Sequence, residues 1–111
     1  MKLFLLRSVT LSLLLSGVAL SGTAIAEVGV VVAEGTPGCD YFVVETSGGY
    51  TLLEWYGGVI SIWTGDKVFG DLHSYGFQDI HLEGRGEMRV WLEDYWMSED
   101  DAAEYFYGNC N

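Results

Sequence analysis

MRVWLEDYW, residues 88–96, begins with a strict alternation of apolar and polar side chains. Its residues at positions 88, 90 and 92 are apolar and fall on one side of an extended chain, whereas Arg89, Trp91 and Glu93 fall on the other. A period of two is typical of a β-strand with one face in a core and the other toward solvent. The sequence therefore predicts a strand here whose outer face carries Trp91.

Six further segments have a similar β character, and turns that contain glycine separate most of them. They are Val28–Ala33, Tyr41–Thr46, Tyr50–Tyr56, Val59–Trp63, Lys67–Leu72 and Phe77–Leu82. Val28–Ala33 is either a first strand or an N-terminal arm, and Gly57-Gly58 either breaks or bulges the strand before it. We therefore expect five to six strands in a mostly β fold, a small antiparallel β-barrel of SH3-like or OB-like size. Parallel βαβ units are excluded because no crossover helix has room.

One short helix is predicted near the C-terminus. Ser98 is a suitable N-cap, and the acids Glu99–Asp101 suit the positive end of the helix dipole. Gly108 is placed to end the helix. About ten residues are too few for a stable isolated helix, so we expect its aromatic side chains to dock on the barrel.

Residues 1–26 have the composition of a secretory signal peptide. A short cationic start precedes the apolar run Val9–Val18, and Ala24-Ile25-Ala26 has the small-x-small pattern of a cleavage site. The apolar run is shorter than the roughly 20 residues of a membrane span. We expect cleavage to leave residues 27–111 as a single small β-rich domain without a membrane span, in a bacterial periplasm or outside the cell.

The two cysteines, Cys39 and Cys110, lie near opposite ends of the expected mature chain. An even pair in an exported protein indicates a disulfide, which here would close a loop of about 70 residues. A redox-active pair is usually close in sequence, as in C-x-x-C, and this pair is not. The sequence therefore predicts a structural disulfide that ties the C-terminal segment to the first turn.

The chain is strongly acidic. It holds 5 Lys and Arg against 16 Asp and Glu, a formal net charge of −11. Removal of residues 1–26 would take two cations and no acid, which leaves 3 − 16 = −13 before any histidine contribution. This charge disfavours nucleic acids and anionic lipid headgroups as partners, and it favours cations or a basic protein.

Aromatic side chains exceed what a small barrel can bury. Aromatic rings on an outer face, surrounded by acids, are typical of interface anchors. The alternative is that the C-terminal helix or a dimer partner covers them. The candidate binding residues are Trp55, Tyr56, Trp91, Tyr95, Trp96 and Glu93.

The two histidines lie in similar tripeptides, Asp71-Leu72-His73 and Asp79-Ile80-His81. If adjacent strands bring them together, two imidazoles and a carboxylate suit Zn²⁺ or another divalent ion. The candidate metal ligands are therefore His73, His81, Asp71 and Asp79, although the spacing matches no specific metal signature and surface histidines are the alternative. No other cofactor is expected.

Catalysis has little support in the sequence. No serine lies in a G-x-S-x-G elbow, and both cysteines are expected to be oxidised. Glu45 and Glu54 lie near corresponding positions of the first hairpin and are the one pair of carboxylates that a hydrolase could use. We therefore expect a non-enzymatic exported module that binds a basic protein partner. A periplasmic protein that binds divalent metal and a self-assembling envelope protein are the alternatives.

Overall fold

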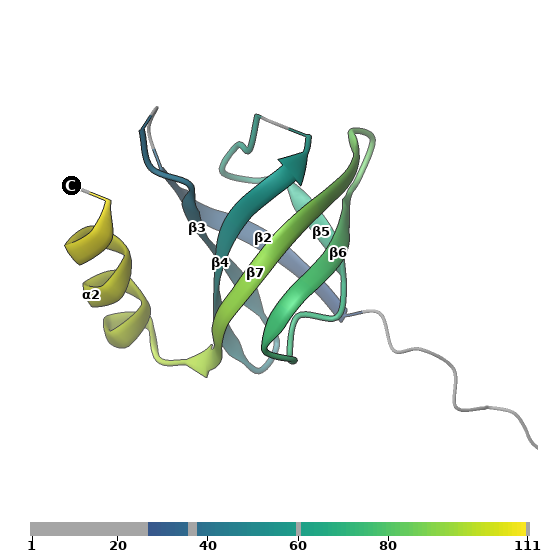
Figure 1. Ribbon diagram of the computed structural model, residues 1–111. Helices are drawn as coiled ribbons and strands as arrows, with labels where there is room; N and C mark the ends of the chain where they lie inside the picture. The colour runs from purple at the N-terminus through teal and green to yellow at the C-terminus, as the bar shows by residue number, and fades with distance from the viewer. Residues whose placement is uncertain (1–26, 36–37, 60, 111) are drawn as a thin grey trace, which may run out of the picture.

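The computed structural model describes residues 27–35, 38–59 and 61–110. In it the chain forms a closed antiparallel β-barrel with one helix against its outside, as Figure 1 shows. This confirms the predicted barrel with a C-terminal helix. The predicted signal peptide lies outside the described residues, and none of the described helices has the length and hydropathy of a membrane span.

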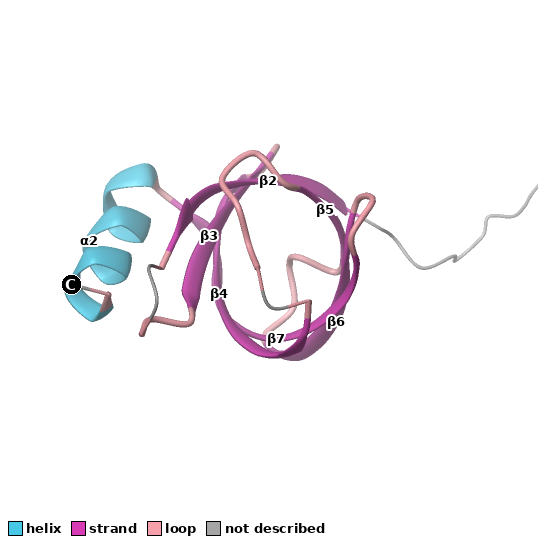
Figure 2. Cartoon of the chain, turned by 90° about the horizontal axis from the view of Figure 1, so that it is seen from above, coloured by secondary structure: helices cyan, strands magenta, loops and turns pink. Residues whose placement is uncertain are grey.

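Six strands form the barrel in the order β2-β3-β4-β7-β6-β5, and β5 pairs back with β2 to close the ring (Figure 2). Every neighbouring pair is antiparallel. Val28–Ala33 is therefore a strand and not an arm. The elements are β2 (Glu27–Glu34), β3 (Tyr41–Thr46), β4 (Gly49–Gly58), β5 (Lys67–Gly70), β6 (Gly76–Leu82), β7 (Gly86–Met97) and α2 (Glu99–Asn109).

The prediction of a strand over Val59–Trp63 is wrong. Val59 and residues 61–63 belong to a loop, and Ile60 lies outside the described residues. The side chains of Val59 and Ile62 pack against the residues that fill the barrel and are partly buried there, without the segment pairing as a strand. Figure 2 shows this loop lying across one end of the barrel. Gly57-Gly58 remains within β4, beside a bulge.

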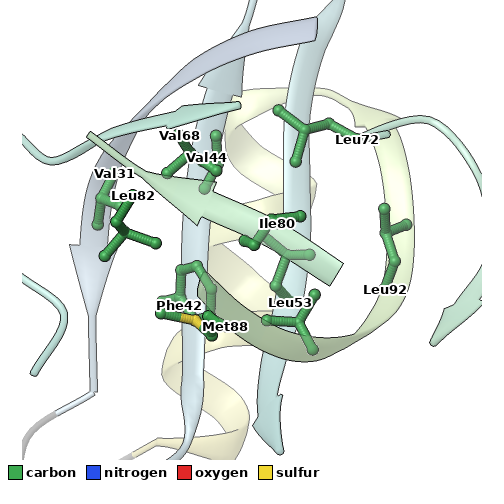
Figure 3. Packing of buried hydrophobic residues seen from close by; sticks show 11 residues of the cluster. Val31, Phe42, Val44, Leu53, Val68, Leu72, Ile80, Leu82, Met88 and Leu92 are labelled. Atoms are coloured by element: carbon green, nitrogen blue, oxygen red, sulfur yellow. The ribbon is translucent and has the colours of Figure 1, made fainter. Parts of the chain in front are cut away.

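Eleven apolar side chains fill the interior of the barrel. They come from the inward positions of all six strands and from Leu72, and each is at most 1% exposed (Figure 3). These residues are Val31, Phe42, Val44, Leu53, Val68, Leu72, Ile80, Leu82, Met88, Val90 and Leu92. The predicted alternation of β7 is confirmed, because positions 88, 90 and 92 are buried whereas Arg89 is exposed and Trp91 is half-buried.

A second apolar cluster joins α2 to the outside of the barrel. Val43 of β3 and Leu52 of β4 contact Ala102 and Phe106 of α2, and all four are nearly inaccessible. The helix therefore docks by an apolar stripe, as its short length requires.

The N-terminal end of α2 is the one that the sequence predicts, whereas its C-terminal end is not. The Ser98 hydroxyl accepts a hydrogen bond from the Asp101 backbone N–H at 3.1 Å, which confirms the predicted N-cap. The prediction that Gly108 ends the helix is wrong. The helix continues through Asn109, because the Cys110 backbone N–H still donates to the Phe106 carbonyl, four residues back.

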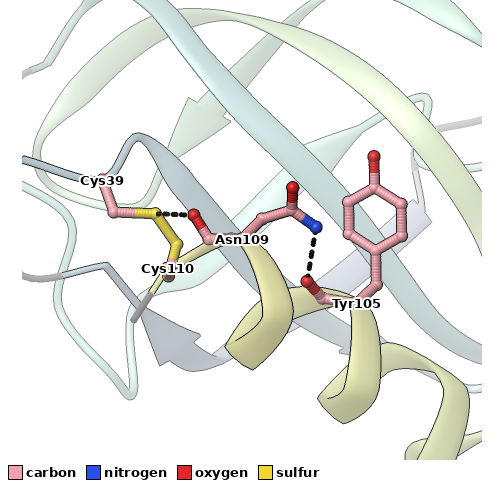
Figure 4. Close-up of a disulfide and its surroundings, with 4 residues drawn as sticks. All are labelled: Cys39, Tyr105, Asn109 and Cys110. Atoms are coloured by element: carbon pink, nitrogen blue, oxygen red, sulfur yellow. Dashed lines mark hydrogen bonds between the residues drawn. A yellow bond between two sulfur atoms is a disulfide. The ribbon is translucent and has the colours of Figure 1, made fainter.

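The predicted disulfide between Cys39 and Cys110 is present. It joins residues 71 positions apart and fixes the C-terminal end of α2 to the segment before β3 (Figure 4). The Asn109 side-chain amide donates to the Tyr105 carbonyl at 2.8 Å within the same turn of helix. Both ends of α2 are thus held, one by the chain leaving β7 and the other by the disulfide.

Candidate functional site

The outer surface of β7 and its neighbours carries two groups of aromatic rings that contact one another edge-on or tilted. The first, which we call the Phe77 cluster, consists of Tyr56, Phe77 and Trp91. The Phe77 ring centroid lies 5.0 Å from that of Tyr56 and 4.9 Å from that of Trp91. The Arg89 guanidinium lies 4.9 Å from the centre of the Phe77 ring and also pairs with Asp79 at 2.9 Å. The cation beside the Phe77 cluster is therefore already paired with a carboxylate.

The second group, the Trp96 cluster, lies at the C-terminal end of β7 and consists of His73, Tyr75, Tyr95 and Trp96. The Tyr95 ring centroid is 4.8 Å from that of Tyr75 and 5.3 Å from that of Trp96. The His73 ring lies 5.3 Å from the Trp96 ring. The Tyr75 hydroxyl donates to Asp94 at 3.2 Å. These contacts hold an aromatic group beside a carboxylate at the surface.

Trp96 has an unusual backbone conformation. Among the described residues it is the one non-glycine residue with a positive φ, 55°. Tyr50 of β4 pairs with Met97 of β7 and Leu52 pairs with Asp94, so one residue of β4 lies opposite two of β7 and β7 carries an extra residue at this point. A bulge of this kind redirects side chains. As a result the Trp96 side chain points outward and is 63% exposed.

The Trp96 indole lies against the turn between β3 and β4. A Cβ atom at Gly48 would lie 2.8 Å from the indole Nε1, so this position has no room for a side chain. Gly48 therefore allows the indole to lie close to the backbone of the turn. This contact, the edge-on contact with Tyr95 and the tilted contact with His73 fix the ring, although most of it remains in solvent.

A notch of about 390 Å³ lies between the end of β7 and the first turns of α2. Its only charged lining residues are the carboxylates Asp94, Asp101 and Glu104, and Trp96, Tyr95 and Tyr105 supply aromatic rings. The notch is lined by Asp94, Tyr95, Trp96, Met97, Ser98, Asp101, Glu104 and Tyr105. Acidic and aromatic groups in one concave site suit a cationic group, because carboxylates attract its charge and aromatic faces interact with it through cation–π contacts.

Two carboxylates and two tyrosines lie side by side next to the notch. The Tyr105 hydroxyl donates to Glu93 at 3.3 Å, and the Tyr105 ring packs edge-on against Tyr41 at 5.8 Å. Burial, followed by the charges of Glu93 and Asp40, raises the pKa of Glu54. Burial of the Glu54 carboxyl and the neighbouring negative charges therefore both disfavour its ionisation.

The pKa of Tyr41 is raised to about 12 by burial, by its hydrogen bond with Tyr105 and by the charge of Glu54. A group with a raised pKa in the folded state stabilises the fold below its unfolded pKa, and this stabilisation is lost as the pH rises through the folded value. Stability should therefore fall between about pH 10 and pH 12. The free energy of unfolding can be measured in urea at several pH values. Between about pH 10 and pH 12 it should fall less for Tyr41→Phe than for the parent, whereas Tyr107→Phe, a control whose side chain is 65% exposed, should behave as the parent does. Parallel curves for Tyr41→Phe and the parent would contradict this assignment.

The predicted binding residues are distributed over three places. Trp91 and Tyr56 belong to the Phe77 cluster, and Tyr95 and Trp96 to the Trp96 cluster, with Glu93 beside the notch. Trp55 lies elsewhere, because it is two positions from the buried Leu53 and, like Leu53, faces the interior of the barrel.

Trp55 packs against the interior of the barrel, and its indole N–H donates to the Val59 carbonyl at 2.8 Å. Together with Trp63 and Tyr41 it lines a separate cavity of about 440 Å³ near the loop across the barrel end. Trp55 is thus removed from the acidic and aromatic surface around β7.

The two histidines have different partners. His73 Nδ1 lies 3.2 Å from Glu27, whereas His81 Nδ1 lies 3.8 Å from Glu87. Asp71 accepts a hydrogen bond from the His73 backbone N–H, and Asp79 pairs with Arg89. In the part of the chain that the structure describes, no three His, Cys, Asp or Glu side chains are placed to hold a metal ion.

The expected proximity of Glu45 and Glu54 is wrong. In the β3–β4 register Glu45 faces Tyr50, and Glu54 faces Tyr41, four pairs away. The loop of the hairpin is shorter than the sequence suggested, since Thr46 already pairs with Gly49. The carboxylates that act on Glu54 are instead Glu93 of β7 and Asp40.

Sequence reasoning missed the contribution of α2 to the site. Asp101, Glu104 and Tyr105 are spaced i, i+3 and i+4, so they share one side of a helix. This spacing is a signal that could have grouped them. Tyr75 and Phe77 were also missed as binding residues, because the glycine between them indicated only a turn.

Comparisons with known proteins give no relative for this chain. No model of a protein family matches it, and neither the curated proteins nor the solved structures contain a match. The structure itself therefore defines the class of protein. It is a closed six-stranded antiparallel barrel with one disulfide-linked helix and an acidic, aromatic notch.

Proposed function

We propose that this protein is an exported, non-enzymatic binding module that recognises a basic protein partner through the notch and the Trp96 cluster. The observation that carries the proposal is Trp96 itself. It is a large apolar side chain, 63% exposed, held in a left-handed backbone conformation beside carboxylates. Such a conformation costs a non-glycine residue roughly 1–2 kcal/mol. Strained residues of this kind cluster at binding and active sites.

The chemistry of the notch supports a cationic ligand group. A lysine or arginine side chain can contact the Trp96 ring by a cation–π interaction, worth about 0.5–2 kcal/mol, while it pairs with Asp94, Asp101 or Glu104. No cation lines the notch to compete for these carboxylates. In the described part of the chain both arginines have other partners, since Arg85 pairs with Asp66 and Arg89 with Asp79.

The overall charge supports the same partner. A surface with a large excess of carboxylates attracts a basic protein over several ångströms and accelerates encounter. Binding of this type weakens as the salt concentration rises, because the attraction between exposed charges is screened. The other two functions predicted from the sequence, metal binding and self-assembly, stay predictions, and no contact in the described residues favours either.

Trp96→Ala is expected to weaken partner binding about tenfold, because it removes an aromatic side chain of the kind that contributes most to binding energy in interfaces. Partners would be captured from envelope extract and culture medium on immobilised residues 27–111 and eluted with stepped salt. The affinity of the retained basic protein would then be measured for each variant. Trp63→Ala is the matched control, because Trp63 is 60% exposed but lies away from the notch and stacks under Arg85. Binding that neither salt nor Trp96→Ala reduces would refute the proposal, as would an equal loss in both variants.

A further inference from the structure

A second concave surface lies on the other side of α2. It is a groove of about 340 Å³ between the helix and the outer faces of β2 and β3. The notch is lined by Asp101, Glu104 and Tyr105 of the helix, whereas this groove is lined by Ala102, Ala103 and Phe106 with their neighbours. Figure 2 shows α2 lying against this side of the barrel, next to β3. The two sites therefore use different sides of one helix.

The floor of the groove is apolar. Val32 and Ala33 of β2 and Val43 of β3 face Ala103 and Phe106 of α2 across it. Val32 is 38% exposed, and Val28 and Val30, on the same outer face of β2, are 51% and 39% exposed. Outside the groove, the same face of β2 therefore carries two further exposed valines. An apolar surface of this kind on an otherwise acidic protein is typical of an interaction site.

The rim of the groove is acidic. Glu45 of β3 and Glu99 of α2 line it, and no lysine or arginine does. Burial, and then the charges of Glu45 and Glu99, raise the pKa of Tyr50 between them. The two carboxylates therefore act on the same small region at the edge of the apolar floor.

The charge decides between two possible occupants. A second copy of the chain would bring an identical set of carboxylates toward Glu45 and Glu99, and like charges in an interface cost several kcal/mol. A segment with an apolar side chain flanked by lysine or arginine complements both the floor and the rim. A volume of this size, about that of a small ligand pocket, accepts a leucine or phenylalanine side chain.

We propose that the groove between α2 and β2–β3 binds an amphipathic, cationic segment of a protein partner. An apolar side chain of that segment enters between Val32 and Ala103, and its basic residues pair with Glu45 and Glu99. This inference rests on the proposed function, because it assigns the basic partner a second point of contact. The pairing of an apolar anchor with charged neighbours is the helix-in-groove mode of recognition.

The test uses two synthetic peptides of equal positive charge, one of leucine and lysine in helical amphipathic order and one of serine and lysine. Each is titrated into the mature chain and its binding followed by fluorescence anisotropy. The leucine–lysine peptide should bind more tightly, and Val32→Glu should weaken it about tenfold, because a carboxylate replaces the apolar contact on the floor. Val28→Glu is the matched control, with the same charge change on the same face of β2 but outside the groove. It should change the affinity less than about twofold. Thermal unfolding of both variants verifies that they are folded.

Other outcomes separate this inference from the proposed function. If Trp96→Ala removes binding of the leucine–lysine peptide but Val32→Glu does not, the result supports the notch as the binding site and refutes the groove. Equal effects of Val32→Glu and Val28→Glu also refute the groove, because charge alone then explains them. Self-association in sedimentation that Val32→Glu abolishes would assign the groove to a second copy and overturn the inference. If neither peptide binds at low salt, the groove and the proposed function both fail.

Discussion

Removal of the disulfide by Cys39→Ala with Cys110→Ala is expected to lower the free energy of unfolding by about 4 kcal/mol. The bond closes a loop of 71 positions, so its loss gives the unfolded chain much more freedom. It also frees the C-terminal end of α2, which then contacts the barrel through the small cluster around Phe106 and through Tyr105, whose hydroxyl donates to Glu93. Urea unfolding measures the loss, and hydrogen exchange should show the amides of α2 opening more often than those of the barrel.

The single variants provide the control for this experiment. The bond requires both sulfurs, so Cys39→Ala and Cys110→Ala should each cost nearly as much as the double variant, and reduction of the parent should have a similar effect. Additive single losses would show that the cysteines stabilise the fold by packing. If the double variant has the same urea midpoint of unfolding as the parent, the expected stabilisation by the disulfide is contradicted.

Phe42→Ala is expected to cost about 3–5 kcal/mol, the usual loss for a phenylalanine deleted from a core. Phe42 is fully buried in the cluster that fills the barrel, to which all six strands contribute side chains. A closed barrel of paired strands cannot collapse easily into the space that the phenyl group of Phe42 vacates, so a cavity should remain. Urea or thermal unfolding measures the loss.

Phe77→Ala is the matched control for Phe42→Ala. The chemical change is the same, but Phe77 lies on the outside of β6 and is 46% exposed. Its loss should cost about 1 kcal/mol, chiefly from the contacts with Tyr56 and Trp91. Similar costs for both variants would mean that the interior of the barrel is not the main source of stability.

The strands were largely predictable because the signals are local. Period-two alternation identified β7, and glycine turns bounded β3, whose predicted limits, Tyr41–Thr46, are those of the structure. Val59–Trp63 was not distinguishable from a strand, since its β-branched and aromatic composition is the same and only the absence of a pairing partner makes it a loop. The closure of β2 on β5 depends on contacts about 40 positions apart, between Glu27 and Gly70 for example, which no local pattern encodes.

The candidate site was predictable only in part. The outward position of Trp91 followed from the alternation of β7. The conformation of Trp96 did not, because it arises from an extra residue in the register between β4 and β7. The notch and the groove exist only once α2 lies on β3 and β4, and the sequence indicates that the helix docks without indicating where.

The closure of the barrel limits how any partner can be recognised. In the described chain each strand already has two neighbours, so the barrel has no edge strand to which a foreign strand could be added along its whole length. Recognition is therefore expected to depend on side chains that project from the paired strands. Such residues can be exchanged singly while the scaffold stays the same, so the specificity of this protein is open to change by point substitution at its surface.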